Sequence, residues 1–172
     1  TRDWSSDVCS SDLANCQSQT NQPKFGLCDD LNEDPAYIDI DDCSKWIAIV
    51  ENNQEIEVIF TAIDNCIEIL RSNGEMENRC EGMLTYNNHI IFVELKERKY
   101  TNSVWIEEGE KQLRKTIAVF VNHNNLAIFK SKKAYIANSK KPQFQYSHKD
   151  RMQKFRTDTG FRLSIQNTIK VS

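Results

Sequence analysis

Apolar and polar residues alternate over two neighbouring segments in the middle of the chain. Residues 80–86 read CEGMLTY and residues 89–96 read HIIFVELK, and only Asn87 and Asn88 separate them. Asparagine tolerates the left-handed backbone conformation that a two-residue hairpin turn needs. We therefore predict a β-hairpin in which Tyr86 lies opposite His89.

The remaining elements follow from shorter patterns. Apolar residues at helical spacing predict a helix over residues 108–121. Residues 56–70 fit both a helical stripe and a strand-rich segment, and we favour the helix. Residues 14–36 are polar and predict a loose lead-in. Strands are expected at the apolar or alternating stretches 37–42, 46–50, 126–129, 133–138 and 161–169.

Residues 1–13 do not resemble the start of a folded domain. Residues 2–13, RDWSSDVCSSDL, can be back-translated into DNA that resembles the adapter used for short-read sequencing libraries. The alternative is a genuine Ser/Asp-rich tail. We interpret residues 1–13 as adapter-derived and exclude them from the fold prediction. Residues 14–172 show no internal repeat and no low-complexity linker, so we expect one domain of mixed α/β (α+β) class.

Composition narrows the class of protein only a little. The chain is 39% hydrophobic and 27% charged, and no apolar stretch reaches the 18 residues of a membrane span. Beyond residue 13 there are five cysteines without a C-x-x-C pair, which favours scattered buried thiols in a reducing cytoplasm over a zinc site.

The charges are distributed unevenly. Residues 14–81 carry a net charge of −11, whereas residues 130–172 carry +9. A basic C-terminal part can face a polyanion, or it can complement the acidic half of the same fold. Lysines are the candidate contacts to phosphate, at Lys132, Lys133, Lys140 and Lys141.

The hairpin register brings two acidic residues together. If Tyr86 lies opposite His89, then Glu81 lies opposite Glu94, with their Cβ atoms about 5 Å apart. Two carboxylates at that spacing repel each other unless a cation lies between them, and Mg²⁺ prefers such ligands. Lys96 projects from the same strand face as Glu94, whereas Val93 and Leu95 point into a core.

The tripeptide Glu94-Leu95-Lys96 on an apolar strand resembles the motif of the PD-(D/E)XK nuclease superfamily, the restriction-endonuclease-like fold. The resemblance covers residues 56–138. It implies a mixed central sheet flanked by helices, catalytic roles for Glu81, Glu94, Lys96 and Gln112, and Mg²⁺ or Mn²⁺ held by Glu81 and Glu94.

Two departures from the family's pattern accompany the resemblance. The first acid is Glu81 where the family usually has Asp, and Thr116 stands where one branch of the family has an aromatic residue after the helical Gln. The resemblance implies a metal-dependent phosphodiesterase acting on nucleic acid, DNA rather than RNA. The alternative is a catalytically inactive module of the same fold that binds nucleic acid or a partner protein. A plain surface pair between Glu94 and Lys96 is the third interpretation.

Overall fold

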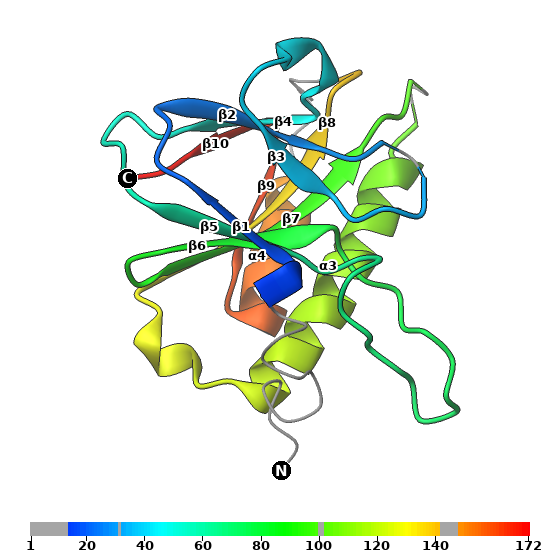
Figure 1. Ribbon diagram of the computed structural model, residues 1–172. Coiled ribbons are helices and arrows are strands. Elements are labelled where there is room, and N and C mark those ends of the chain that lie inside the picture. The colour runs from blue at the N-terminus through cyan, green and yellow to red at the C-terminus, as the bar shows by residue number, and fades with distance from the viewer. Residues whose placement is uncertain (1–13, 31, 100–101, 142–147) are drawn as a thin grey trace.

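The structure is a computed structural model that describes residues 14–30, 32–99, 102–141 and 148–172. The segment that we interpret as adapter-derived lies outside these residues. Figure 1 shows the arrangement of the elements, which form two β-sheets and a helical layer. The predicted mixed α/β class is confirmed.

The larger sheet has six strands and carries the predicted hairpin. Its strands are antiparallel from β1 to β7, whereas β7, β8 and β9 run parallel. Parallel neighbours need a crossover connection, and α3 (Val104–His123) and α4 (Lys149–Thr159) supply the two crossovers. In spatial order the strands are β1 (Gln17–Thr20), β5 (Val58–Ala62), β6 (Gly82–Tyr86), β7 (His89–Lys96), β8 (Ser131–Asn138) and β9 (Arg162–Ile165).

The smaller sheet is assembled from segments far apart in the sequence. The last strand, β10, pairs in parallel with β4, which in turn pairs antiparallel with β2. In spatial order the strands are β10 (Thr168–Lys170), β4 (Ala48–Glu51), β2 (Lys24–Cys28) and β3 (Tyr37–Asp39). Both ends of the chain's described part therefore contribute to a single packed unit.

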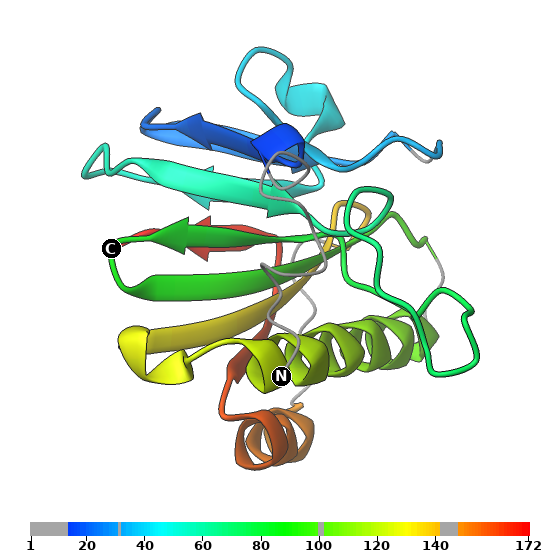
Figure 2. The same cartoon turned by 60° about the horizontal axis from the view of Figure 1, so that its bottom comes forward.

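Figure 2 shows the layers from the side, with α3 and α4 on one face of the six-stranded sheet. Strand β7 is buried on both faces. Its residues Ile90 and Phe92 pack in the core under the helices, whereas Ile91, Val93 and Leu95 pack in the core shared with the smaller sheet. The prediction that Val93 and Leu95 point into a core is confirmed.

Three sequence predictions are wrong. Residues 56–70 do not form a helix: they contain β5 and then a turn. The alternation of Val58, Phe60 and Ala62, which all point into the shared core, outweighs the helical stripe. The lead-in 14–36 contains β1 and β2 rather than a loose segment. The expected strand 126–129 is a 3₁₀-helix (Leu126–Ile128) whose first turn is capped by the side chain of Asn125.

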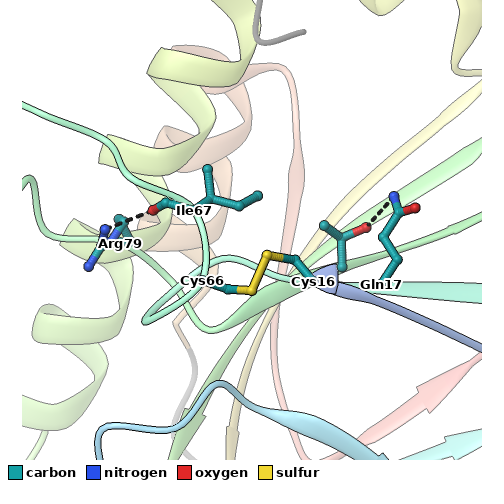
Figure 3. The surroundings of a disulfide bond; sticks show 6 residues. Cys16, Gln17, Cys66, Ile67 and Arg79 are labelled. Carbon is teal, nitrogen blue, oxygen red and sulfur yellow. Dashed lines mark hydrogen bonds between the residues drawn. A yellow bond between two sulfur atoms is a disulfide. The ribbon is translucent and has the colours of Figure 1, made fainter. Parts of the chain in front are cut away.

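The prediction that all five cysteines are scattered thiols is also wrong. Cys16 and Cys66 form a disulfide that joins the segment before β1 to the turn after β5. Figure 3 shows this bond beside Ile67 and Arg79. Cys28 and Cys80 are buried free thiols, and Cys43 is an exposed one. The two cysteines are 50 residues apart in the sequence, and their spacing alone gave no reason to pair them.

Within the described residues, no helix is both long and apolar enough to cross a membrane.

Candidate functional site

The β6–β7 hairpin positions the two motif residues. The ladder pairs Tyr86 with His89 and Gly82 with Val93, which is the predicted register. Glu81 lies one residue beyond the end of this ladder, so it is placed beside Glu94 rather than on the opposite face. Its backbone carbonyl accepts a hydrogen bond from Ile63 N at 2.9 Å, which fixes the chain at this point.

Glu94 is completely buried between β7 and α3. Its relative exposure is 0%, and Oε1 lies 2.6 Å from Lys96 Nζ. The short contact with Lys96 is an ion pair, and the backbone N–H of Glu81 also favours the ionised form of this carboxylate. Loss of hydration raises the pKa of Glu94 to about 7, although the ammonium of Lys96 opposes the shift.

Lys96 connects Glu94 to the helix. Its Nζ donates a hydrogen bond to Gln112 Oε1 at 2.7 Å, and its side chain is only 11% exposed. The other end of the amide, Gln112 Nε2, donates to the backbone carbonyl of Arg79 at 3.1 Å. Gln112 therefore bridges the strand that carries Lys96 and the segment that leads into Glu81.

Thr116, one turn after Gln112 on the same helix face, holds this segment as well. Its hydroxyl accepts a hydrogen bond from Cys80 N at 2.9 Å and donates to the carbonyl of Gln112 at 3.1 Å. Thr116, which stands where one branch of the family has an aromatic residue, therefore anchors the backbone next to Glu81. The four catalytic candidates, Glu81, Glu94, Lys96 and Gln112, are brought to one place.

A glycine lets the helix approach the buried carboxylate. A Cβ atom at Gly109 would lie 3.3 Å from Glu94 Cγ and 3.1 Å from Ile136 Cγ2. Such distances are too short for relaxed packing, so a larger residue there would push the helix away from the sheet. The absence of a side chain at Gly109 keeps Glu94 covered.

Glu81 is the more strongly perturbed of the two acids. Burial, followed by the negative charge of Glu94, raises its pKa to about 9, and Asp29 and Asp64 add to the effect. Lys96 lowers this pKa, but not enough to compensate. At neutral pH the site by itself therefore favours a protonated Glu81, and only an added cation would favour two ionised carboxylates.

Asp64 lies at the margin of this acidic group. It forms an ion pair with Arg79, with Arg79 Nη2 at 3.0 Å from Asp64 Oδ1, and its side chain is 32% exposed. Arg79 also donates to the backbone carbonyl of Ile67 at 2.8 Å. The turn that contains Asp64 is joined to the segment before β1 by the disulfide between Cys66 and Cys16 (Figure 3).

The four candidate phosphate-binding lysines do not form one set. Lys140 follows the end of β8 and lies near Lys96, because the backbone N–H of the preceding Ser139 donates a hydrogen bond to the Lys96 carbonyl. The ammonium of Lys140 forms an ion pair with Glu97, with 3.6 Å between Nζ and Oε1. Lys141 is its neighbour. Lys132 and Lys133 lie near the start of β8, opposite Ile90 and Ile91, at the other end of the sheet. Only Lys140 and Lys141 lie at the end of the sheet that carries the carboxylates.

The two carboxyl groups of the site suit a hard cation that takes only a few of its ligands from the protein. Among the described residues, no group of three or more His, Cys, Asp and Glu side chains is arranged to hold a metal ion. Mg²⁺, however, is commonly held by one or two carboxylates and completes its shell with water and phosphate oxygens. The buried carboxylate of Glu94 fits this pattern together with the carboxyl group of Glu81, which lies close enough for the charge of Glu94 to raise its pKa.

Arg79 and Gly109 position the candidate site but belong to no sequence motif, and Thr116, noted only as a departure from the family's pattern, positions it as well. Thr116 was detectable, because it lies four residues after Gln112 and so on the same helix face. Arg79 and Gly109 act through contacts between distant segments, which no local pattern reveals.

Comparison of the chain with models of protein families, with curated protein sequences and with solved structures gave no match in any of the three.

Proposed function

We propose that this protein is a metal-dependent phosphodiesterase of the PD-(D/E)XK type that cleaves nucleic acid, with DNA as the expected substrate. One observation carries the proposal. A buried Glu94, its partner Lys96 and the helical Gln112 form a continuous chain of contacts, with a second, charge-coupled Glu81 beside it. A surface ion pair would need neither the burial nor the second acid.

Each residue has a chemical task in this proposal. Glu81 and Glu94 would hold Mg²⁺ or Mn²⁺, which supplies Lewis acidity and lowers the pKa of a water when it is bound. Lys96, released from its present partner, would hold the attacking water or balance the charge that develops on the phosphate. Gln112, which binds both Lys96 and the Arg79 carbonyl, would keep the lysine oriented.

The surroundings of the site support a polyanionic substrate. Lys140 and Lys141 follow β8 at the same end of the sheet, and Arg98 follows β7 there. A hollow lined by Arg98, Asn102 and Glu108, among others, adjoins this end of β7 and the start of α3. Cations placed around a carboxylate site attract a phosphodiester backbone that the carboxylates alone would repel.

A second candidate function is a non-catalytic module of the same fold, which binds nucleic acid or a partner protein. The 2.6 Å contact between Lys96 and Glu94 favours it, because the ammonium already neutralises the carboxylate that a metal would need. The very low exposure of both side chains also limits the access of water and substrate.

Metal titration separates the two functions. In a nuclease, Mn²⁺ should raise the melting temperature, because a ligand that binds only the native state stabilises it. The shift and the cleavage of labelled DNA should both disappear in Glu94→Ala and persist in Glu57→Ala, which removes an exposed carboxylate. A Mn²⁺ shift absent from the unsubstituted protein would favour the non-catalytic module, and cleavage that survives Glu94→Ala would refute the assignment of the site.

The cytoplasmic location expected from the sequence stays a prediction. The Cys16–Cys66 bond is the observation against it, because disulfides persist mainly in oxidising compartments.

A further inference from the structure

A hollow with cationic walls lies at the end of the six-stranded sheet opposite to the candidate site. It is formed where the segment before β8, the end of α4 and the start of β9 meet. Strands β8 and β9 place two of its cations side by side, because Lys133 is the register partner of Arg162. The five cations that line it are Lys130, Lys132, Lys133, Arg156 and Arg162.

These cations are not neutralised by the protein. The lining of the hollow contains no Asp or Glu, and none of the five forms an ion pair with an acid in the part of the chain that the structure describes. Cations nearer the middle of the helical layer are paired: Arg114 of α3 and Arg151 of α4 both contact Glu110. The hollow therefore gathers five cations without an acidic partner at one place.

The helix end explains only part of this accumulation. Arg156 and Gly160 lie at the C-terminal end of α4, where the helix carries a partial negative charge of about half a unit. That charge is far smaller than the charge of five cations. Mutual repulsion of the side chains lowers the stability of the protein, and a bound polyvalent anion would remove the penalty.

We propose that this hollow binds phosphate groups of a nucleic-acid strand, as a second anchoring site remote from the carboxylates. The inference rests on the proposed function for the identity of the ligand. Five cations around one hollow favour a multiply charged phosphate over a single carboxylate, and the guanidinium groups of Arg156 and Arg162 with the Ser131 hydroxyl can donate to its oxygens.

The register of β8 sets the distance between the two sites. In the ladder of β7 and β8, Lys132 of the hollow lies opposite Ile90, and Ile136 lies opposite Glu94. Along the strands, the hollow and the buried Glu94 are therefore four residues apart. At about 3.3 Å per residue this is roughly 13 Å along the strand, and the level of Lys96 is roughly 20 Å away. DNA rises about 3.4 Å per base pair, so a ligand that occupies both sites spans at least about four to six base pairs.

Binding without cleavage tests the proposal. Fluorescence anisotropy in EDTA would measure the affinity of the full chain for a labelled duplex of about 12 base pairs over a range of salt concentrations. The test variant is Lys130→Ala/Arg156→Ala/Arg162→Ala, whose three side chains are exposed, and the matched control is Lys24→Ala/Lys45→Ala/Lys170→Ala, with the same loss of charge from exposed positions around the smaller sheet. A cooperative thermal unfolding transition in each would establish that all three proteins are folded.

We expect the test variant to bind the duplex at least about tenfold more weakly than the control, and its log–log salt slope to be shallower by about 2 to 3. Inorganic phosphate and a mononucleotide should compete only weakly for the hollow, because they lack the second anchoring point. Equal affinity of the test variant and the control would overturn the proposal. Competition by inorganic phosphate as effective as that by DNA would also overturn it, in favour of a site for a small anion. The proposal would also be overturned if the test variant lost binding to vesicles containing phosphatidylserine while its binding to DNA stayed unchanged.

The experiment separates this inference from the proposed function. Suppose that cleavage depends on Mn²⁺ and on Glu94, but the test variant binds DNA with unchanged affinity. This result would refute the role of the hollow in DNA binding and would support the proposed nuclease activity. A weakened affinity of the test variant in a protein that shows no cleavage would support the hollow and refute the nuclease.

Discussion

Replacement of Glu81 by Gln should make the metal-free protein more stable at alkaline pH. In the unfolded chain this carboxyl loses its proton near its usual pKa of 4.5, whereas in the folded protein burial and the nearby charge of Glu94 raise its pKa to about 9. Between these two values the folded state holds a proton that the unfolded state has released. Stability therefore falls as the pH rises through this window.

The size of the effect follows from the slope. One proton of difference changes the free energy of unfolding by about 1.4 kcal/mol per pH unit, so the change between pH 6 and pH 8 is at most about 3 kcal/mol. For a chain of this size, about 1 kcal/mol corresponds to roughly 2–4 °C in melting temperature, and the expected difference is on the order of 5–10 °C. Glu81→Gln removes this contribution because the amide does not ionise.

Urea unfolding in EDTA at pH 6, 7 and 8, followed by circular dichroism, would measure the effect. The free energy of unfolding of the unsubstituted protein should fall more steeply with pH than that of Glu81→Gln, whereas Glu57→Gln, at an exposed position, should follow the unsubstituted protein. Added Mn²⁺ should stabilise the unsubstituted protein more at pH 8 than at pH 6, because a protonated carboxyl is a poor ligand. Parallel pH profiles for the unsubstituted protein and Glu81→Gln would refute the argument that Glu81 is held protonated.

Three further predictions concern the same site and its supports. Gly109→Ala should lower the Mn²⁺-induced rise in melting temperature, because the new methyl group would press on Glu94, and a shift equal to that of the unsubstituted protein would count against this packing. Lys96→Met should raise the pKa of Glu94 further, because the opposing ammonium is lost, and carboxyl titration by NMR would measure the change. Replacement of both Cys16 and Cys66 by Ser should reduce the free energy of unfolding by about 4 kcal/mol for a loop of 50 residues, and denaturant titration without reductant would show whether it does.

The local part of the fold followed from the sequence. The hairpin was predictable because its register depends on two neighbouring strands and a short turn, and Asn87 does adopt a left-handed conformation, with φ of 48°. The helix that carries Gln112 was predictable from its apolar spacing, and it extends from Val104 to His123. The hairpin register also predicted that Glu81, Glu94 and Lys96 lie together, whereas Gln112 was expected beside them only from the resemblance.

The contacts between distant segments did not follow from the sequence. Strand β10 pairs with β4 across most of the chain, and no short pattern encodes that pairing. The apolar residues of segment 56–70 fit both a helical and a strand periodicity. Pairing with the neighbouring strands β1 and β6 makes the first part of the segment a strand. The cysteine spacing equally left the pairing of Cys16 with Cys66 open.

The position of the disulfide has a consequence for the association of folding intermediates. Strand β1 is the outermost strand of the six-stranded sheet, it is largely exposed, and the bond at Cys16 fastens it to the turn that follows β5. Without β1, the backbone groups of β5 along Val58–Ala62 would form an open, apolar edge of the kind that pairs with other chains. Oxidation of this cysteine pair therefore protects the protein from edge-to-edge aggregation, and its reduced form should aggregate sooner during refolding.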